Sequence, residues 1–106
     1  MLEEGQARVA EPAASGWRVN QWLKKAVLLY FRIHDNQVVQ GGYTHFFDKV
    51  PLRWADPDDQ HISDTHARVV PPATVRRGAF IGPDAVLMPS YVNIGAWVGA
   101  GSMVDT

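Results

Sequence analysis

Two oppositely charged residues occupy matching positions at either end of the C-terminal part of the chain. Arg68 directly precedes Val69, and Asp105 directly follows Val104. An arginine binds a carboxylate best through two parallel hydrogen bonds, and an aspartate can hold an amine or accept its proton. Together the pair could bind a ligand that carries both groups. On spacing alone, two solvated surface charges are the more ordinary interpretation, because charged side chains are mostly exposed.

Whether these charges lie near each other depends on a repeat in the residues between them. Branched aliphatic residues recur at a six-residue step, with one residue missing between Ile81 and Val86, and Ala or Ser follows four places after nearly all of them. The aliphatic positions are Val69, Val75, Ile81, Val86, Val92, Val98 and Val104. Neither the helical period nor simple strand alternation produces this pattern. A short fixed period is typical of a chain that stacks on itself in successive coils.

The repeat predicts that residues 67–106 start a parallel β-helix of the hexapeptide kind, in which each hexad supplies one short strand and one corner. The aliphatic residue of each hexad would point inward, and glycines and prolines would form the corners. Three hexads make a coil, so Arg68 and Asp105 are expected to point outward on the same side, two coils and roughly 10 Å apart. A set of ordinary short strands with Gly/Pro turns is the alternative.

Residues 1–66 are predicted to form a small α+β region with a helix near residues 21–33. This stretch contains no Gly or Pro, and Asn20 is a suitable N-cap. Six apolar residues are assigned to one helical face: Trp22, Leu23, Ala26, Val27, Tyr30 and Ile33. Residues 54–66 are acidic and turn-rich, and are predicted to connect this region to the repeat. Arg76 and Arg77 are interpreted as solvated charges rather than a phosphate-binding pair, with contact between either arginine and a carboxylate as the alternative.

Composition excludes several classes of protein. The 106 residues suit one modest domain, with 46% apolar and 20% charged residues as in soluble globular proteins. The net charge of −1 gives no nucleic-acid footprint, and the absence of cysteine excludes disulfides and thiolate metal sites. No signal peptide is recognisable, and no apolar run approaches the roughly 20 residues that span a bilayer. A cytoplasmic protein is expected.

Several strings of residues resemble the tetrahydrodipicolinate N-succinyltransferases of the hexapeptide-repeat acyltransferase superfamily. They include QWLKKAVLL, FDKVP, RVVPPA, VLMPSYVNIGA and MVDT, and the resemblance runs from about Arg8 to Thr106. It implies an α/β region, a left-handed parallel β-helix and a C-terminal cap, assembled as a homotrimer with active sites between subunits. It also implies succinyl transfer from succinyl-CoA to ring-opened tetrahydrodipicolinate (2-amino-6-oxopimelate) in lysine and diaminopimelate biosynthesis. No cofactor beyond the CoA donor is implied.

The same resemblance implies that Arg68 and Asp105 are substrate-binding residues, and it identifies no catalytic residue. Family members continue through further coils after MVDT, which hold most of the donor-binding part. The sequence therefore predicts the truncated start of a longer enzyme, or a degenerate gene product, without activity of its own. The alternative is a non-catalytic oligomerisation or scaffold module that kept the repeat.

Two other functions are disfavoured by the distribution of histidine. A hexapeptide-repeat carbonic anhydrase needs three histidine ligands from stacked coils, and residues 69–106 contain none. The connector holds a loose cluster of acidic residues and histidines that matches no zinc motif, so no metal site is predicted. Its members are Asp58, Asp59, His61, Asp64 and His66.

Overall fold

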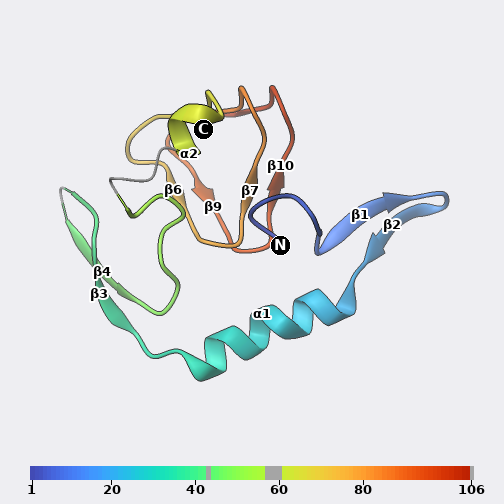
Figure 1. The fold of residues 1–106 in the computed structure, drawn as a ribbon, viewed down its shortest axis with the longest axis horizontal. Helices are drawn as coiled ribbons and strands as arrows, with labels where there is room; N and C mark the ends of the chain where they lie inside the picture. Colours follow the sequence, from blue (N-terminus) through green and yellow to red (C-terminus); the bar gives the residue numbers. More distant parts are fainter. Residues whose placement is uncertain (43, 57–60, 106) are drawn as a thin grey trace.

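The computed structural model describes residues 1–42, 44–56 and 61–105, and it has a small mixed α/β fold with short strands (Figure 1). In the N-terminal part, helix α1 joins two antiparallel hairpins, and a short helix α2 follows. Their bounds are β1 Ala10–Ala13, β2 Gly16–Val19, α1 Gln21–Ile33, β3 Gln37–Gln40, β4 His45–Asp48 and α2 His61–Asp64. Two-residue strands make up the C-terminal part: β5 Arg68–Val69, β6 Thr74–Val75, β7 Phe80–Ile81, β8 Val86–Leu87, β9 Tyr91–Val92, β10 Trp97–Val98 and β11 Met103–Val104.

Helix α1 covers the residues for which the sequence predicts a helix. It begins after Asn20, whose backbone is extended and whose carbonyl oxygen accepts hydrogen bonds from the N–H groups of Leu23 and Lys24. The Asn20 side chain makes no cap bond, and its Nδ2 instead donates to the carbonyl oxygen of Arg8 at 2.7 Å. The start of the helix is therefore tied to the segment that precedes β1.

The apolar residues on the predicted face of α1 differ in burial. Leu23 is buried and Val27 half-buried, whereas Trp22, Ala26 and Ile33 are exposed. At about 100° per residue the six residues assigned to one helical face do lie on one side of α1, but only one edge of that side is buried. One row of apolar side chains therefore contacts the chain, and the neighbouring row faces outward.

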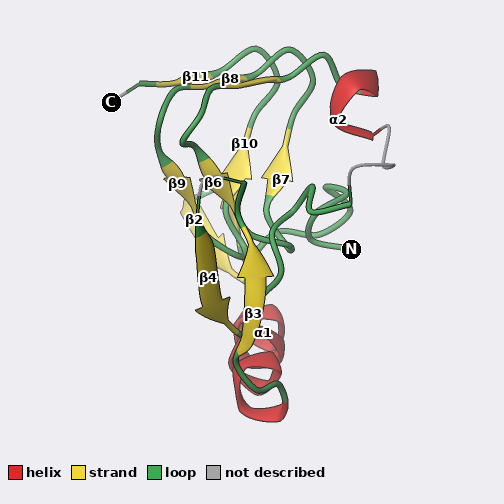
Figure 2. Cartoon of the chain, turned by 90° about the vertical axis from the view of Figure 1, so that its left-hand side faces the viewer, coloured by secondary structure: helices red, strands yellow, loops and turns green. Residues whose placement is uncertain are grey.

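The short C-terminal strands pair in parallel with the strand three places further along the chain. The sheets have the orders β11-β8-β5, β6-β9 and β7-β10, and Figure 2 shows β8 and β11 side by side. Arg68 of β5 pairs with Val86 of β8, and Thr74 of β6 pairs with Tyr91 of β9. Each strand therefore lies on the same side of the stack as the strand three places earlier, and directly beside it.

The buried positions of these strands differ from the predicted ones at a single step. Leu87 is 0% exposed and pairs with both Val69 and Val104, whereas Val86 is half-buried. The six-residue step therefore continues from Ile81 to Leu87, and the missing residue lies in the corner between Leu87 and Val92. The prediction at Val86 is wrong because two adjacent branched residues fit the repeat equally well, and only the strand register decides between them.

One hydrophobic core lies inside the stacked strands. Its buried members are Val75, Ala79, Ile81, Ala85, Leu87 and Val92, and Val69, Val98 and Val104 pack against it. Ala79 and Ala85 are 0% exposed, at corner positions for which the repeat predicts small residues. The aliphatic residues of each strand point into this core, and small residues occupy the corners. The residues next to the aliphatic ones therefore point outward.

Residues 51–53 cover the outer edge of β6. Leu52 and Arg76 form an antiparallel bridge, and the N–H of Arg53 donates to the carbonyl oxygen of Val75 at 2.8 Å. The N–H of Arg77 donates to the carbonyl oxygen of Pro51 at 2.9 Å. This pairing satisfies backbone groups that would otherwise form an open strand edge.

The first residues of the chain are anchored to the stack by a carboxylate. Glu3 forms ion pairs with Arg77 at 2.7 Å and with the buried Arg53 at 3.8 Å, and it accepts a hydrogen bond from the N–H of Gly78 at 3.1 Å. Three segments that are far apart in the sequence, around residues 3, 53 and 77, therefore meet at one charged cluster, called here the anchoring cluster. No helix in the described part of the chain is long and apolar enough to cross a membrane.

Candidate functional site

Arg68 and Asp105 lie at the two outer strands of one three-stranded parallel sheet. Arg68 opens β5, Asp105 directly follows β11, and β8 lies between them. Both residues are exposed, while their neighbours Val69 and Val104 pack against the core. Both side chains therefore point away from the core on the same sheet.

The separation of the two charges follows from the pairing. Arg68 is level with Val86, which is level with Met103, so Asp105 lies two strands across and two residues along. With strands about 4.8 Å apart and a rise of about 3.4 Å per residue, the two Cα atoms are roughly 12 Å apart. A ligand that binds both groups must therefore be extended, or be reached by the long arginine side chain.

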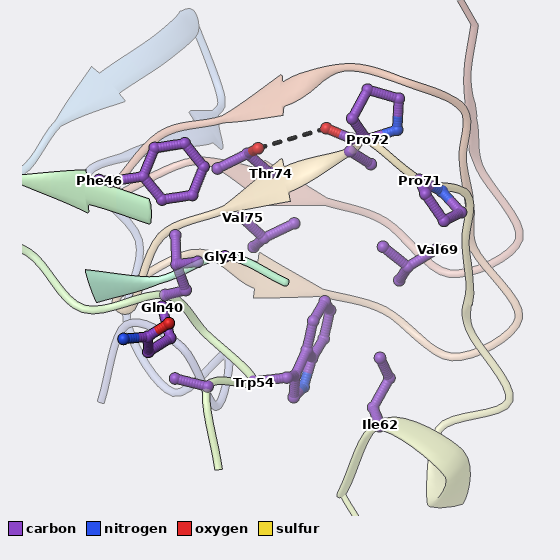
Figure 3. Close-up of a pocket in the computed structure, with 13 residues that line it drawn as sticks. Gln40, Gly41, Phe46, Trp54, Ile62, Val69, Pro71, Pro72, Thr74 and Val75 are labelled. Atoms are coloured by element: carbon purple, nitrogen blue, oxygen red, sulfur yellow. Dashed lines mark hydrogen bonds between the residues drawn. The ribbon is translucent and has the colours of Figure 1, made fainter. Parts of the chain in front are cut away.

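An apolar cavity of about 490 Å³ lies between the β3–β4 hairpin and the first strands of the stack (Figure 3). Its lining includes Phe46, Trp54, Ile62, Val69 and Pro72, and among the described residues no charged side chain is part of it. The indole Nε1 of Trp54 is buried and has no hydrogen-bond partner within the described residues. The cavity therefore suits an apolar group, and its described lining contains no ionisable side chain that could act as a general acid or base.

A smaller cavity of about 380 Å³ contains an arginine that is already paired. Arg76 forms an ion pair with Asp48 at 2.9 Å and donates to Oδ1 of Asn93 at 3.1 Å. Its guanidinium also lies 5.5 Å from the ring centre of Phe31. The interpretation of Arg76 as a solvated charge is wrong, and the alternative of contact with a carboxylate holds, because the ion pair with Asp48 connects Arg76 to the β3–β4 hairpin.

The electrostatics of the anchoring cluster favour an ionised Glu3. Burial alone would raise the pKa of Glu3, but the hydrogen bonds from Gly78 and Arg77 and the charges of Arg53 and Arg77 hold it below its ordinary value. The sequence offered contact between Arg77 and a carboxylate as an alternative, but it identified neither Glu3 nor Arg53 as members of this cluster. Its only signal was a pair of N-terminal glutamates, because partners so far apart in sequence leave no local pattern.

The loose cluster of histidines and acidic residues in the connector gains no structural support as a metal centre. Asp58 and Asp59 lie outside the described residues. The side chain of His61 lies outside the described part as well, and among the side chains that the structure does describe, no three histidines, aspartates or glutamates are grouped as metal ligands would be.

Comparison with known proteins gives consistent matches to one enzyme. Residues 1–33 match the family model described as the N-terminal part of tetrahydrodipicolinate N-succinyltransferase. A 2,3,4,5-tetrahydropyridine-2,6-dicarboxylate N-succinyltransferase from Idiomarina loihiensis is 58% identical over 105 residues, which are 99% of this chain and 38% of the relative. The relative of the same name from Sodalis glossinidius is 57% identical, with the same coverage.

This chain is related to the tetrahydrodipicolinate N-succinyltransferases. A further N-succinyltransferase of that name, from Tolumonas auensis, is 63% identical over 90% of the chain and 34% of its own length. The resemblance predicted from the sequence strings is thereby confirmed. The chain spans little more than a third of the length of the N-succinyltransferases that it matches.

Proposed function

We propose that this chain is the N-terminal part of an acyl-CoA-dependent N-succinyltransferase that acts on tetrahydrodipicolinate in lysine and diaminopimelate biosynthesis. The observation that carries the proposal is identity of 57–63% to enzymes of that name over 90–99% of the chain. In the reaction, the amine of 2-amino-6-oxopimelate attacks the thioester carbonyl of succinyl-CoA. The new amide bond forms as the carbon–sulfur bond to CoA breaks.

We further propose that residues 67–106 are the first coils of a left-handed parallel β-helix, and that residues 1–66 form its α+β N-terminal region. Parallel pairing of each strand with the third strand after it supports one coil per three strands. The left hand is the hand that the resemblance implies. Inward-facing Val75, Ile81 and Leu87, one from each of three successive strands, support the enclosed core of such a helix.

Arg68 and Asp105 are proposed as substrate-binding residues. The guanidinium would bind a carboxylate of the amino diacid as a fork, and the carboxylate would hold the attacking amine or accept its proton. Their exposure on the outer face of one sheet supports this assignment. Succinyl-CoA is the co-substrate, and no further cofactor is proposed.

The remainder of the enzyme supplies the rest of the chemistry in this proposal. Donors for the oxyanion and most of the CoA site would lie in coils that follow MVDT, so the 106 residues alone are expected to transfer no succinyl group. The complete enzyme is proposed to be a homotrimer with sites shared between neighbours. A cytoplasmic location remains a prediction from the sequence.

Removing either charge should weaken binding of the substrate analogue 2-aminopimelate to the chain by about tenfold, because a charge-assisted hydrogen bond contributes roughly 1.5 kcal/mol or more. Arg68→Gln and Asp105→Asn test the two residues, and Lys24→Gln and Asp35→Asn are matched exposed controls. Isothermal titration calorimetry measures the dissociation constants.

Equal affinities for all four variants would contradict the two site assignments. If the unaltered chain bound neither 2-aminopimelate nor succinyl-CoA, the result would instead favour the non-catalytic oligomerisation or scaffold module.

A further inference from the structure

The outward face of the β11-β8-β5 sheet carries two apolar side chains between the proposed binding residues. Leu87 of β8 is 0% exposed and belongs to the core. Because successive residues of a strand point to opposite faces, Val86 and Met88, on either side of Leu87, both point outward. Both are half-buried. Val86 and Met88 are called here the apolar pair.

A line drawn from Arg68 to Asp105 crosses β8 between the two members of the apolar pair. Val86 is level with Arg68 in the pairing of β5 with β8. The N–H of Met88 donates to the carbonyl oxygen of Val104 at 2.9 Å, so the parallel ladder with β11 continues past the strand and places Met88 level with Asp105. The apolar pair therefore occupies the middle of the face that separates the two charges.

The outward positions on the other two sides of the stack have a different character. On the β6–β9 side they include Arg76 and Asn93, which are hydrogen-bonded to each other at 3.1 Å. On the β7–β10 side, the guanidinium of Arg8 lies over Trp97, 4.2 Å from a ring centre, so the N-terminal segment covers an apolar position there. The apolar pair instead lies between a cation and an anion, an arrangement that suits a small molecule with charged ends and an apolar middle.

The substrate of the proposed reaction has this construction. In 2-amino-6-oxopimelate, three methylene groups separate the carbon that bears the amine from the keto acid at the other end. Removing one methylene group from water contributes a gain in affinity of about fourfold, provided that an apolar surface receives it. Polar side chains at the middle of the face would hold water there and forgo this gain.

We propose that Val86 and Met88 form the surface on which the methylene chain of an α-amino dicarboxylic acid lies, and that this contact sets the chain length that the site prefers. The inference deepens the proposed function and rests on it, because Arg68 and Asp105 must bind the two ends. A diacid with one methylene group fewer would leave part of the apolar pair in water. The site should therefore prefer 2-aminopimelate to 2-aminoadipate, although the two ligands carry identical charged groups.

The ratio of two dissociation constants, called here the methylene ratio, tests the contact. It is the dissociation constant of 2-aminoadipate divided by that of 2-aminopimelate, both measured by isothermal titration calorimetry, and the unaltered chain should give about four. Val86→Thr and Met88→Gln nearly keep the size of each side chain and replace apolar atoms with polar ones, so each should lower the ratio to about two or less. A ratio near one in the unaltered chain would overturn the proposal before any variant is made.

Met103 provides the matched control on the same face of the sheet. It is 64% exposed on β11 and level with Val86, but it lies off the line between the two charges. Met103→Gln should therefore leave the methylene ratio unchanged, and circular dichroism checks that all three variants have the same folded content. Equal reductions of the ratio by Met88→Gln and Met103→Gln would overturn the placement of the methylene chain over the apolar pair.

The charge variants separate failure of this inference from failure of the proposed function. Arg68→Gln should weaken binding of both diacids by the same factor and leave the methylene ratio unchanged. A loss of affinity in Arg68→Gln, together with a ratio near one in the unaltered chain, would overturn only the role of the apolar pair. If neither Arg68→Gln nor Asp105→Asn weakened binding of either diacid, or if neither diacid bound, the site assignments and this inference would both be overturned.

Discussion

Replacing Glu3 with glutamine is expected to lower the free energy of unfolding by about 2 kcal/mol, since hydrogen bonds to charged groups contribute roughly 1.5–3 kcal/mol. The carboxylate accepts two hydrogen bonds from Arg77, at 2.7 and 3.1 Å, and one from the N–H of Gly78. It is also the carboxylate paired with Arg53, which is only 5% exposed. Glutamine keeps the shape but leaves a buried guanidinium without its counter-charge, which is the costly way to break such a pair.

Urea denaturation measures this loss, and Glu4→Gln is the matched control. Glu4 is exposed and adjacent, and a surface substitution of this kind usually changes stability by less than about 0.5 kcal/mol. Equal stabilities for the two variants would mean that the anchoring cluster contributes nothing to the fold.

The difference between the unaltered chain and Glu3→Gln should also depend on pH. The pKa of Glu3 is lowered in the folded chain below its ordinary value of 4.5. The stabilisation from Glu3 is therefore complete above the pKa of the unfolded chain, and is lost as pH falls through the folded pKa. Unfolding at a series of pH values from 7 to 3 should show the two proteins converging at the acid end. A constant difference would contradict an ionised Glu3.

Replacing Leu87 with alanine should cost about 3 kcal/mol, because truncating a fully buried leucine removes its transfer free energy and leaves a cavity. Leu87 is 0% exposed and pairs with strands on both sides. Val86→Ala is the matched control in the same strand. Since Val86 is only half-buried, its truncation should cost less than about 1 kcal/mol.

The comparison of these two variants by thermal or urea unfolding tests the phase of the repeat. A larger loss for Val86→Ala than for Leu87→Ala would restore the inward position predicted from the sequence. A larger loss for Leu87→Ala supports the register in which Leu87 stands between Val69 and Val104.

Local signals in the sequence were sufficient to predict helix α1, but not to predict which of its residues are buried or which residue of β8 points inward. Helix α1 was predictable because the lack of Gly and Pro and the helical spacing of its apolar residues are local signals within 13 residues. Which of its apolar residues are buried was not predictable, because burial depends on which side the rest of the chain occupies. At Val86 and Leu87 the choice needed the partner strands β5 and β11, which are three strands before and three strands after β8 in the sequence.

In the candidate site, too, positions set by the local repeat were predictable and contacts between distant segments were not. Periodicity predicted that Arg68 and Asp105 belong to one side of the stack, and both are exposed on a single sheet. The burial of Arg53 and its pairing with Glu3 were not predictable, because the attraction acts between segments with no shared pattern. Whether the substrate uses Arg68 and Asp105 stays a prediction.

The shortened step from Leu87 to Val92 also bears on how relatives of this chain can differ in length. A residue lost within a strand would exchange inward and outward side chains along the whole of it. At Met88–Ser90 the loss falls in the corner between β8 and β9, and Val92 still enters the core. Single-residue insertions and deletions should therefore accumulate at corners during evolution, so that alignments of such proteins are anchored by their strands and not by a fixed count of six.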